Sequence, residues 1–171
     1  MIGVPDLLAH VLLAYAVAQA LSWRYRWLSP AYVTVVMAGA MIPDLSKAAM
    51  VLPGTRVEAL LGVPFDWFAL HTSGGVLLSI LVGVALVAPT ERRRVFLLLA
   101  LGAATHLFAD ALLLKPSGRS YPVFWPLTRY HPPTPGLYLS TEPRPAVVAA
   151  VAALVARVVT RRHGDHEAGT D

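Results

Sequence analysis

A histidine and an aspartate, His106 and Asp110, lie four residues apart inside an apolar run that covers residues 95–114. On a helix, this spacing places both side chains on one face about one turn apart, so both can reach a single ion. Ionisable side chains within a membrane-length apolar segment are expensive, and they mark a functional site by default. The alternative is a hydrogen bond within the helix that has only a structural role.

Three further residues share this chemistry and fall at the ends of other apolar runs. His10 opens the first run, Asp44 closes the second and His71 opens the third. Three imidazoles and two carboxylates form a nitrogen and oxygen ligand set that suits a divalent metal, with zinc first and manganese or iron as alternatives. The chain has no cysteine, which excludes disulfides and thiolate ligands. A histidine at a helix end can also be merely interfacial.

The elements that must position these residues are apolar runs in a chain of 171 residues. Hydrophobic residues make up 56% of the chain and charged residues 14%, against about 25% charged in a soluble domain. This composition predicts an all-α integral membrane protein, a polytopic transmembrane bundle of four to five helices in one domain, 1–160. A polar tail, 161–171, is expected to be disordered. The apolar runs cover residues 7–21, 31–42, 71–87, 95–114 and 146–160.

Two segments are not predicted to be simple membrane-spanning helices, and the first apolar run has an alternative interpretation. The run 31–42 stops at Pro43 and is too short to cross about 30 Å of hydrocarbon, so it is a partial span or a buried helix. Residues 115–145 hold eight of the fourteen prolines and are expected to form a long outer loop. Residues 18–20, Ala-Gln-Ala, resemble a signal-peptidase site, and cleavage there is an alternative that would remove His10.

Arginines near the apolar runs predict the topology. Pairs or triplets of arginine lie between the first and second runs, between the third and fourth, and after the fifth. If all five runs alternate across the membrane, these three connections share one side, which the positive-inside rule assigns to the cytoplasm. The candidate ligands then lie on the extracytoplasmic side of the cell membrane. The net charge of +4 reflects these flanking cations, so no nucleic-acid partner is expected.

Four ordered motifs, together with a histidine in the first apolar run that His10 matches, resemble those of the YdjM-type membrane-bound metal-dependent hydrolases. The resemblance spans residues 10–126. The motifs are Gly39-Ala40-Met41-Ile42-Pro43-Asp44, His71-Thr72-Ser73, Thr105-His106-Leu107-Phe108-Ala109-Asp110 and Tyr121-Pro122-Val123-Phe124-Trp125-Pro126.

The resemblance implies an integral membrane metal site, and a distant similarity to zinc-dependent phospholipases C suggests phosphoester hydrolysis. Two positions depart from the family pattern. Ser46 stands where the family usually has a second acid, and Asp66 stands where it usually has a histidine. Asp66 retains an oxygen ligand or proton acceptor, whereas Ser46 is a poor ligand.

The sequence therefore predicts a hydrolase that cleaves a phosphoester or ester of an amphiphile, with the lipid bilayer as its other partner. Metal ligands are expected at His10, Asp44, His71, His106 and Asp110, and the catalytic proton acceptor at Asp66 or Asp44. Two rival functions remain: an ion or proton transporter, and a non-catalytic scaffold. The sequence leaves the oligomeric state open. Residues expected to contact the substrate are Ser73, Arg119, Trp125 and Arg129.

Overall fold

The architecture is entirely helical in the part of the chain that the computed structural model describes, namely the backbone of residues 4–168 and the side chains of 6–162. This confirms the predicted all-α class. The elements in chain order are α1 (Val4–Ser22), α2 (Pro30–Met41), the 3-10 helix η1 (Pro43–Met50), α3 (Gly54–Leu61), the 3-10 helix η2 (Trp67–His71), α4 (Ser73–Ala85), α5 (Arg92–Ala111) and α6 (Arg144–Ala168).

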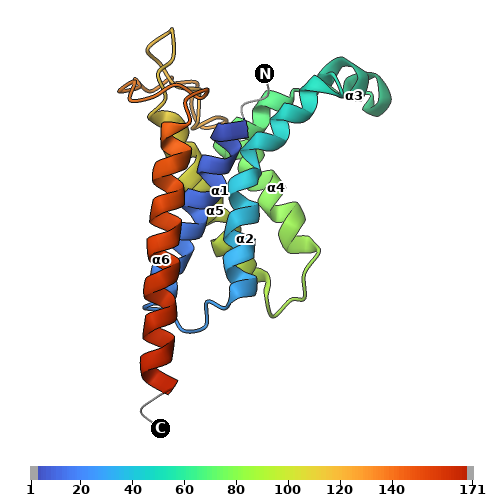
Figure 1. Ribbon diagram of the computed structural model, residues 1–171. Helices are drawn as coiled ribbons and strands as arrows, with labels where there is room; N and C mark the ends of the chain where they lie inside the picture. The colour runs from blue at the N-terminus through green and yellow to red at the C-terminus, as the bar shows by residue number, and fades with distance from the viewer. Residues whose placement is uncertain (1–3, 169–171) are drawn as a thin grey trace.

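The bundle is built around α1, α2 and α5. α1 packs against α6 on one flank and against α2 on the other, while α5 packs against α2 and α4 (Figure 1). Small residues allow the closest of these approaches, because Gly39 of α2 and Gly102 of α5 bring the two backbones into contact. Ala14 and Ala18 of α1 are fully buried in the apolar core between these helices.

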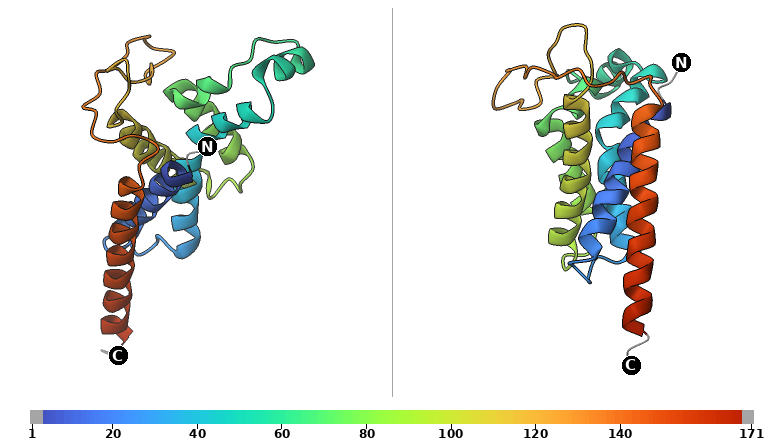
Figure 2. Two further views of the ribbon diagram at one scale, coloured as in Figure 1. Left: turned by 45° about the horizontal axis from the view of Figure 1, so that its top comes forward. Right: turned by 60° about the vertical axis from the view of Figure 1, so that its left-hand side comes forward.

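The connections sort to two ends of the bundle. The segment from α2 to α4 and the 112–143 loop lie at one end, together with the start of α1, whereas the α1–α2 and α4–α5 connections lie at the other (Figures 1 and 2). α6 runs from the first end to the second. The α1–α2 connection, the α4–α5 connection and the end of α6, which carry the arginine clusters, therefore lie at the same end of the bundle.

Residues 43–71, which join the second and third apolar runs, contain three short helices. Pro43 ends α2 but begins η1, because a proline is tolerated in the first turn of a helix. The axis bends by 52° between α2 and η1. η1 then packs against η2, which ends at His71.

Helix ends differ from the predicted ones at α5 and α6. The apolar run continues to Leu114, but α5 ends at Ala111 because the backbones of Leu112 and Leu114 pair with Leu137 and Tyr138 of the following loop. The 112–143 loop contains only isolated β-bridges and no helix, as its prolines predict. α6 continues to Ala168, beyond residue 160, where the sequence predicts that it ends.

Among the described residues, α5 is long and apolar enough to cross a membrane by itself. The bent pair of α2 and η1 passes the same criterion together, which gives up to two such segments. α1 and α4 are apolar but shorter. Length and composition therefore support fewer spans than the predicted four to five.

Candidate metal centre

The five predicted ligands converge at one place in the bundle. His10 comes from α1, Asp44 from the first turn of η1, His71 from the end of η2, and His106 and Asp110 from α5. All five are buried, and His10 and His106 are each only 1% exposed. Residues from four separate segments thus form one polar cluster inside an otherwise apolar bundle.

Asp110 is the centre of this cluster. Its Oδ1 atom lies 3.2 Å from Nε2 of His10, and its Oδ2 atom lies 3.5 Å from Nε2 of His106 and 3.7 Å from Nε2 of His71. The rings of His10 and His106 stack with their centroids 3.7 Å apart. The carboxylate of Asp110 therefore faces the Nε2 atom of each of the three imidazoles.

These spacings match the geometry of a metal site. Ligand atoms about 2.1 Å from a tetrahedral zinc ion lie about 3.4 Å from one another, close to the separations around Asp110. Two groups have ligand atoms all within 4.8 Å of one another, and they share His106. One group is His10, His106 and Asp110, and the other is Asp44, His71 and His106. The donor set fits a divalent metal of the zinc type.

The orientation of the His106 ring is fixed by the main chain. Its Nδ1 atom lies 2.7 Å from the carbonyl oxygen of Ala40. A carbonyl only accepts hydrogen bonds, so Nδ1 donates the hydrogen bond and Nε2 faces the cluster. A backbone carbonyl behind the second nitrogen is the usual support of a metal-bound histidine.

Several buried atoms of the cluster have unused bonding capacity within the described part of the chain, and two of them belong to residues that could share one metal ion. Nε2 of His106 and Oδ2 of Asp44 find no hydrogen-bond partner within the described part of the chain. Leaving a buried polar atom unsatisfied costs about 1–3 kcal/mol. A cation bound between these atoms removes that cost, which supports the fit of the donor set to a metal.

A polar cavity of about 400 Å³ adjoins the cluster. Lys115 reaches it from the end of α5, with its Nζ atom 3.2 Å from the ring centroid of Tyr121. Burial lowers the pKa of Lys115, although the carboxylates of Asp110 and Asp6 act in the opposite sense. The other lining residues that carry charge or hydroxyl groups are Asp6, Asp44, Ser46, Lys47, His71, Asp110, Tyr121 and Ser140.

A sequence model of the YdjM inner membrane protein family matches residues 6–167, nearly the whole chain. The chain belongs to the YdjM family. Membership agrees with the predicted membrane localisation. Comparison with curated proteins and with solved structures found no match.

This YdjM protein has two further charged residues at the cluster, which the sequence interpretation missed. Asp6 Oδ1 lies 3.3 Å from Nε2 of His10, and Lys47 Nζ lies 2.6 Å from Asp44 Oδ1 and 3.7 Å from Asp6 Oδ2. The signal was present, because Asp6 and His10 have the same four-residue spacing as His106 and Asp110. Lys47 occupies one oxygen of Asp44 and leaves the other free.

Asp66 does not join the cluster. It is exposed, and its Oδ1 atom accepts a hydrogen bond from the backbone N–H of Phe68 at 2.8 Å, which caps η2. The side chain therefore turns toward its own helix, and the prediction that it supplies a ligand for the YdjM site is not supported by this geometry. Ser46, the other departure from the family pattern, lines the polar cavity.

The four predicted substrate contacts also lie outside the polar cavity. Ser73 donates from its hydroxyl to the carbonyl oxygen of Trp125 at 3.1 Å, so these two residues fasten the 112–143 loop to the start of α4. The loop carbonyls of Val123 and Trp125 also occupy the first N–H groups of that helix. Arg119 and Arg129 are exposed. The residues that line the cavity and carry positive charge are instead Lys47 and Lys115.

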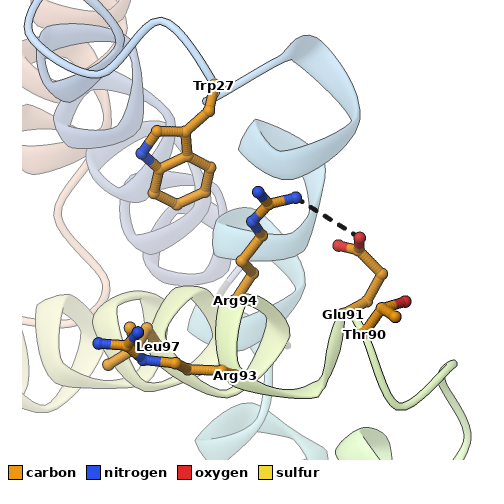
Figure 3. Close-up of a pocket in the computed structure, with 6 residues that line it drawn as sticks. All are labelled: Trp27, Thr90, Glu91, Arg93, Arg94 and Leu97. Carbon is orange, nitrogen blue, oxygen red and sulfur yellow. Dashed lines mark ion pairs between the residues drawn. The ribbon is translucent and has the colours of Figure 1, made fainter.

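A second cavity, of about 560 Å³, lies at the opposite end of the YdjM bundle, where α5 begins (Figure 3). Arg94 projects into it beside Trp27 and pairs with Glu91 at 3.5 Å. The residues that line it offer a single carboxylate and no imidazole. This cavity therefore lacks the ligands of a metal centre.

Proposed function

We propose that this protein is a membrane-embedded, metal-dependent hydrolase that cleaves a phosphoester or ester of an amphiphilic substrate. The observation that carries the proposal is the position of Asp110, whose two oxygens lie within 3.2–3.7 Å of three imidazole nitrogens. Buried imidazoles and carboxylates of this kind, drawn from four segments, are expensive in a membrane unless they bind an ion. The polar cavity beside them provides space for the bond to be cleaved.

The ligands are His10, His71, His106, Asp110 and Asp44, and zinc suits them best. A bound divalent metal would supply Lewis acidity and bring the pKa of a water molecule close to neutrality. Lys47 and Lys115 line the cavity, and their ammonium groups can bind the oxygens of a phosphoester.

Asp6 is the carboxylate placed to accept a proton in the cavity. It lines the cavity but belongs to neither group of potential ligands. In this role it replaces Asp66, whose carboxylate caps η2. Lys47 lies 3.7 Å from Asp6 and holds it beside His10, within reach of a substrate at the cluster.

The arrangement in the membrane is part of the proposal. α1, α4 and α6 join α5 and the bent pair of α2 and η1 in crossing or entering the bilayer. Large apolar side chains that are exposed along α4 and α6 support this placement in the bilayer. Their contact with water would be unfavourable, whereas contact with lipid would not. They are Leu77, Leu78, Leu81 and Val82 on α4, and Val148, Val151, Leu154 and Val155 on α6. The arginines at the opposite end support an extracytoplasmic position for the metal centre.

The decisive experiment measures metal content and hydrolysis together on the full chain purified in detergent. Metal is quantified by inductively coupled plasma mass spectrometry, and hydrolysis with bis(4-nitrophenyl) phosphate and a short-chain phospholipid. We expect His106→Ala to reduce both by at least about tenfold, the lower bound for losing even a supporting group of a metal ligand. His131→Gln is the matched control, because His131 lies in the loop and contacts Ser120. Unchanged metal content in His106→Ala would exclude a metal-dependent reaction at this site.

A further inference from the structure

An apolar groove of about 370 Å³ runs along the seam between α1 and α6. On α6 it is lined by Pro145, Val148, Ala149 and Ala152, which follow the i, i+3, i+4, i+7 pattern of one helix face. This stripe is about 10 Å long at 1.5 Å per residue. Two of its four residues are alanine, whose small side chains leave the seam hollow.

The groove reaches the metal centre. Its inner wall includes His10, which is nearly inaccessible to water and whose Nε2 atom lies 3.2 Å from Asp110. Asp110 in turn lines the polar cavity. The His10–Asp110 pair therefore separates two spaces of opposite character, one apolar and one charged.

The groove is charged at one end and open along its side. Glu142 and Arg144 form the rim where α6 begins, at the loop end of the bundle. Below this rim the walls are apolar, and Val148 is 68% exposed, so the groove opens to the surroundings of the bundle. A charged rim above apolar walls complements an amphiphile with one polar and one hydrocarbon end.

We propose that this groove holds one hydrocarbon chain of the amphiphilic substrate, which enters sideways from the bilayer between α1 and α6. The chain lies against Leu13, Val148 and Ala152, and the polar junction of the molecule lies at His10. This inference rests on the proposed function for the claim that the bound lipid is the substrate. Binding of a hydrocarbon chain in the groove does not itself depend on hydrolysis.

The test blocks the groove with one bulky side chain. Ala152 is exposed and lines the groove, so Ala152→Trp fills it without disturbing the packed face of α6. Ala150→Trp is the matched control, because Ala150 is also exposed on α6 but lines none of the cavities described above. Val148→Trp is a second blocking variant.

Binding of palmitoyl-oleoyl phosphatidylglycerol to the detergent-solubilised full chain is measured by native mass spectrometry. We expect one lipid to bind the wild type and Ala150→Trp, and its affinity to fall at least about tenfold in Ala152→Trp and Val148→Trp. Glycerol phosphate, which has the headgroup chemistry but no chain, should compete only weakly, because it makes no contact with the apolar groove. Equal lipid affinity in all four proteins, or a second copy of the chain in place of the lipid, would overturn the groove assignment.

Hydrolysis separates this inference from the proposed function. If the groove is correct, Ala152→Trp retains its metal and still cleaves bis(4-nitrophenyl) phosphate, which has no chain, but loses cleavage of the phospholipid. If the wild type cleaves neither compound while lipid binding remains sensitive to Ala152→Trp, the hydrolase proposal fails and the chain-binding groove stands.

Discussion

A β-carbon on Gly102 would lie 1.9 Å from the carbonyl oxygen of Val36, so the backbones of α5 and α2 touch at this point. The contact is reciprocal, since a β-carbon on Gly39 would lie 2.3 Å from the carbonyl oxygen of Leu99. The crossing lies one turn from His106, and it sets the distance at which Nδ1 of His106 meets the carbonyl of Ala40. His106 is thus positioned by a close approach of two helices that only glycine permits.

Gly102→Ala should therefore damage both stability and the site. The methyl group must push α2 away from α5, and overpacking of this kind costs about 1–3 kcal/mol. We expect a lower midpoint of thermal unfolding in detergent and weaker metal binding. Gly83→Ala is the control, because its β-carbon would meet only the side-chain Cδ1 atom of Leu99, at 3.2 Å, and that atom can move. Equal midpoints for the two variants would contradict a backbone contact at Gly102.

Phosphate binding should depend on pH through Lys115. Because burial lowers the pKa of this lysine below its usual 10.5, the ammonium loses its charge at a lower pH than an exposed lysine does. The positive charge is present below that pKa and lost above it. We expect the affinity for inorganic phosphate, measured by calorimetry, to decline as the pH rises toward 10.5. Lys115→Arg should abolish the decline, because arginine stays charged throughout. Persistence of the decline in that variant would assign it to another group.

Substitutions of Asp66 distinguish a role as the cap of η2 from a direct role in catalysis. Its carboxylate accepts a hydrogen bond from the N–H of Phe68, and the amide oxygen of asparagine can do the same. We expect Asp66→Asn to keep its metal and its hydrolytic rate, whereas Asp66→Ala should lose about 1 kcal/mol of stability through loss of the cap. A proton acceptor cannot be replaced by an amide. Loss of hydrolysis in Asp66→Asn with metal retained would therefore return Asp66 to the catalytic site.

The orientation in the membrane can be measured in a chain that has no cysteine. Tyr130→Cys places a thiol in the exposed part of the 112–143 loop, and Arg93→Cys places one at the opposite end of the bundle. In intact cells, a membrane-impermeant maleimide should label position 130 and spare position 93. The reverse pattern would place the metal centre on the cytoplasmic side without dispersing it.

The apolar pattern predicted the helices better than it predicted their ends. α1, α2, α4, α5 and α6 each lie on an apolar run, because a helix that packs in a bundle needs apolar residues over its whole length. The end of α5 depends on the pairing of Leu112 and Leu114 with residues 137 and 138, which no local pattern reveals. η1, α3 and η2 were missed because they are short, and η1 and α3 also mix polar with apolar residues.

The site was predictable where polar residues interrupt apolar runs. His106 and Asp110 stand out in this way, and the arginine positions placed the remaining ligands at the same end of the bundle. Asp66 was predicted because it stands where the family pattern has a histidine, and that pattern does not reveal that its side chain accepts a hydrogen bond from Phe68 at the start of η2. Lys47 and Lys115 could not be distinguished from ordinary interfacial lysines without the fold.

The order in which the ligands occur along the chain has a consequence for biosynthesis. His10 leaves the ribosome long before Asp110, its partner at 3.2 Å, and Asp44 and His71 emerge between them. Until α5 has been synthesised, each of these side chains lacks the Asp110 carboxylate that contacts three of the histidines in the folded chain. Asp110 is thus the residue whose arrival completes the site, and α6, synthesised last, then packs against α1 and closes the flank of the bundle beside His10.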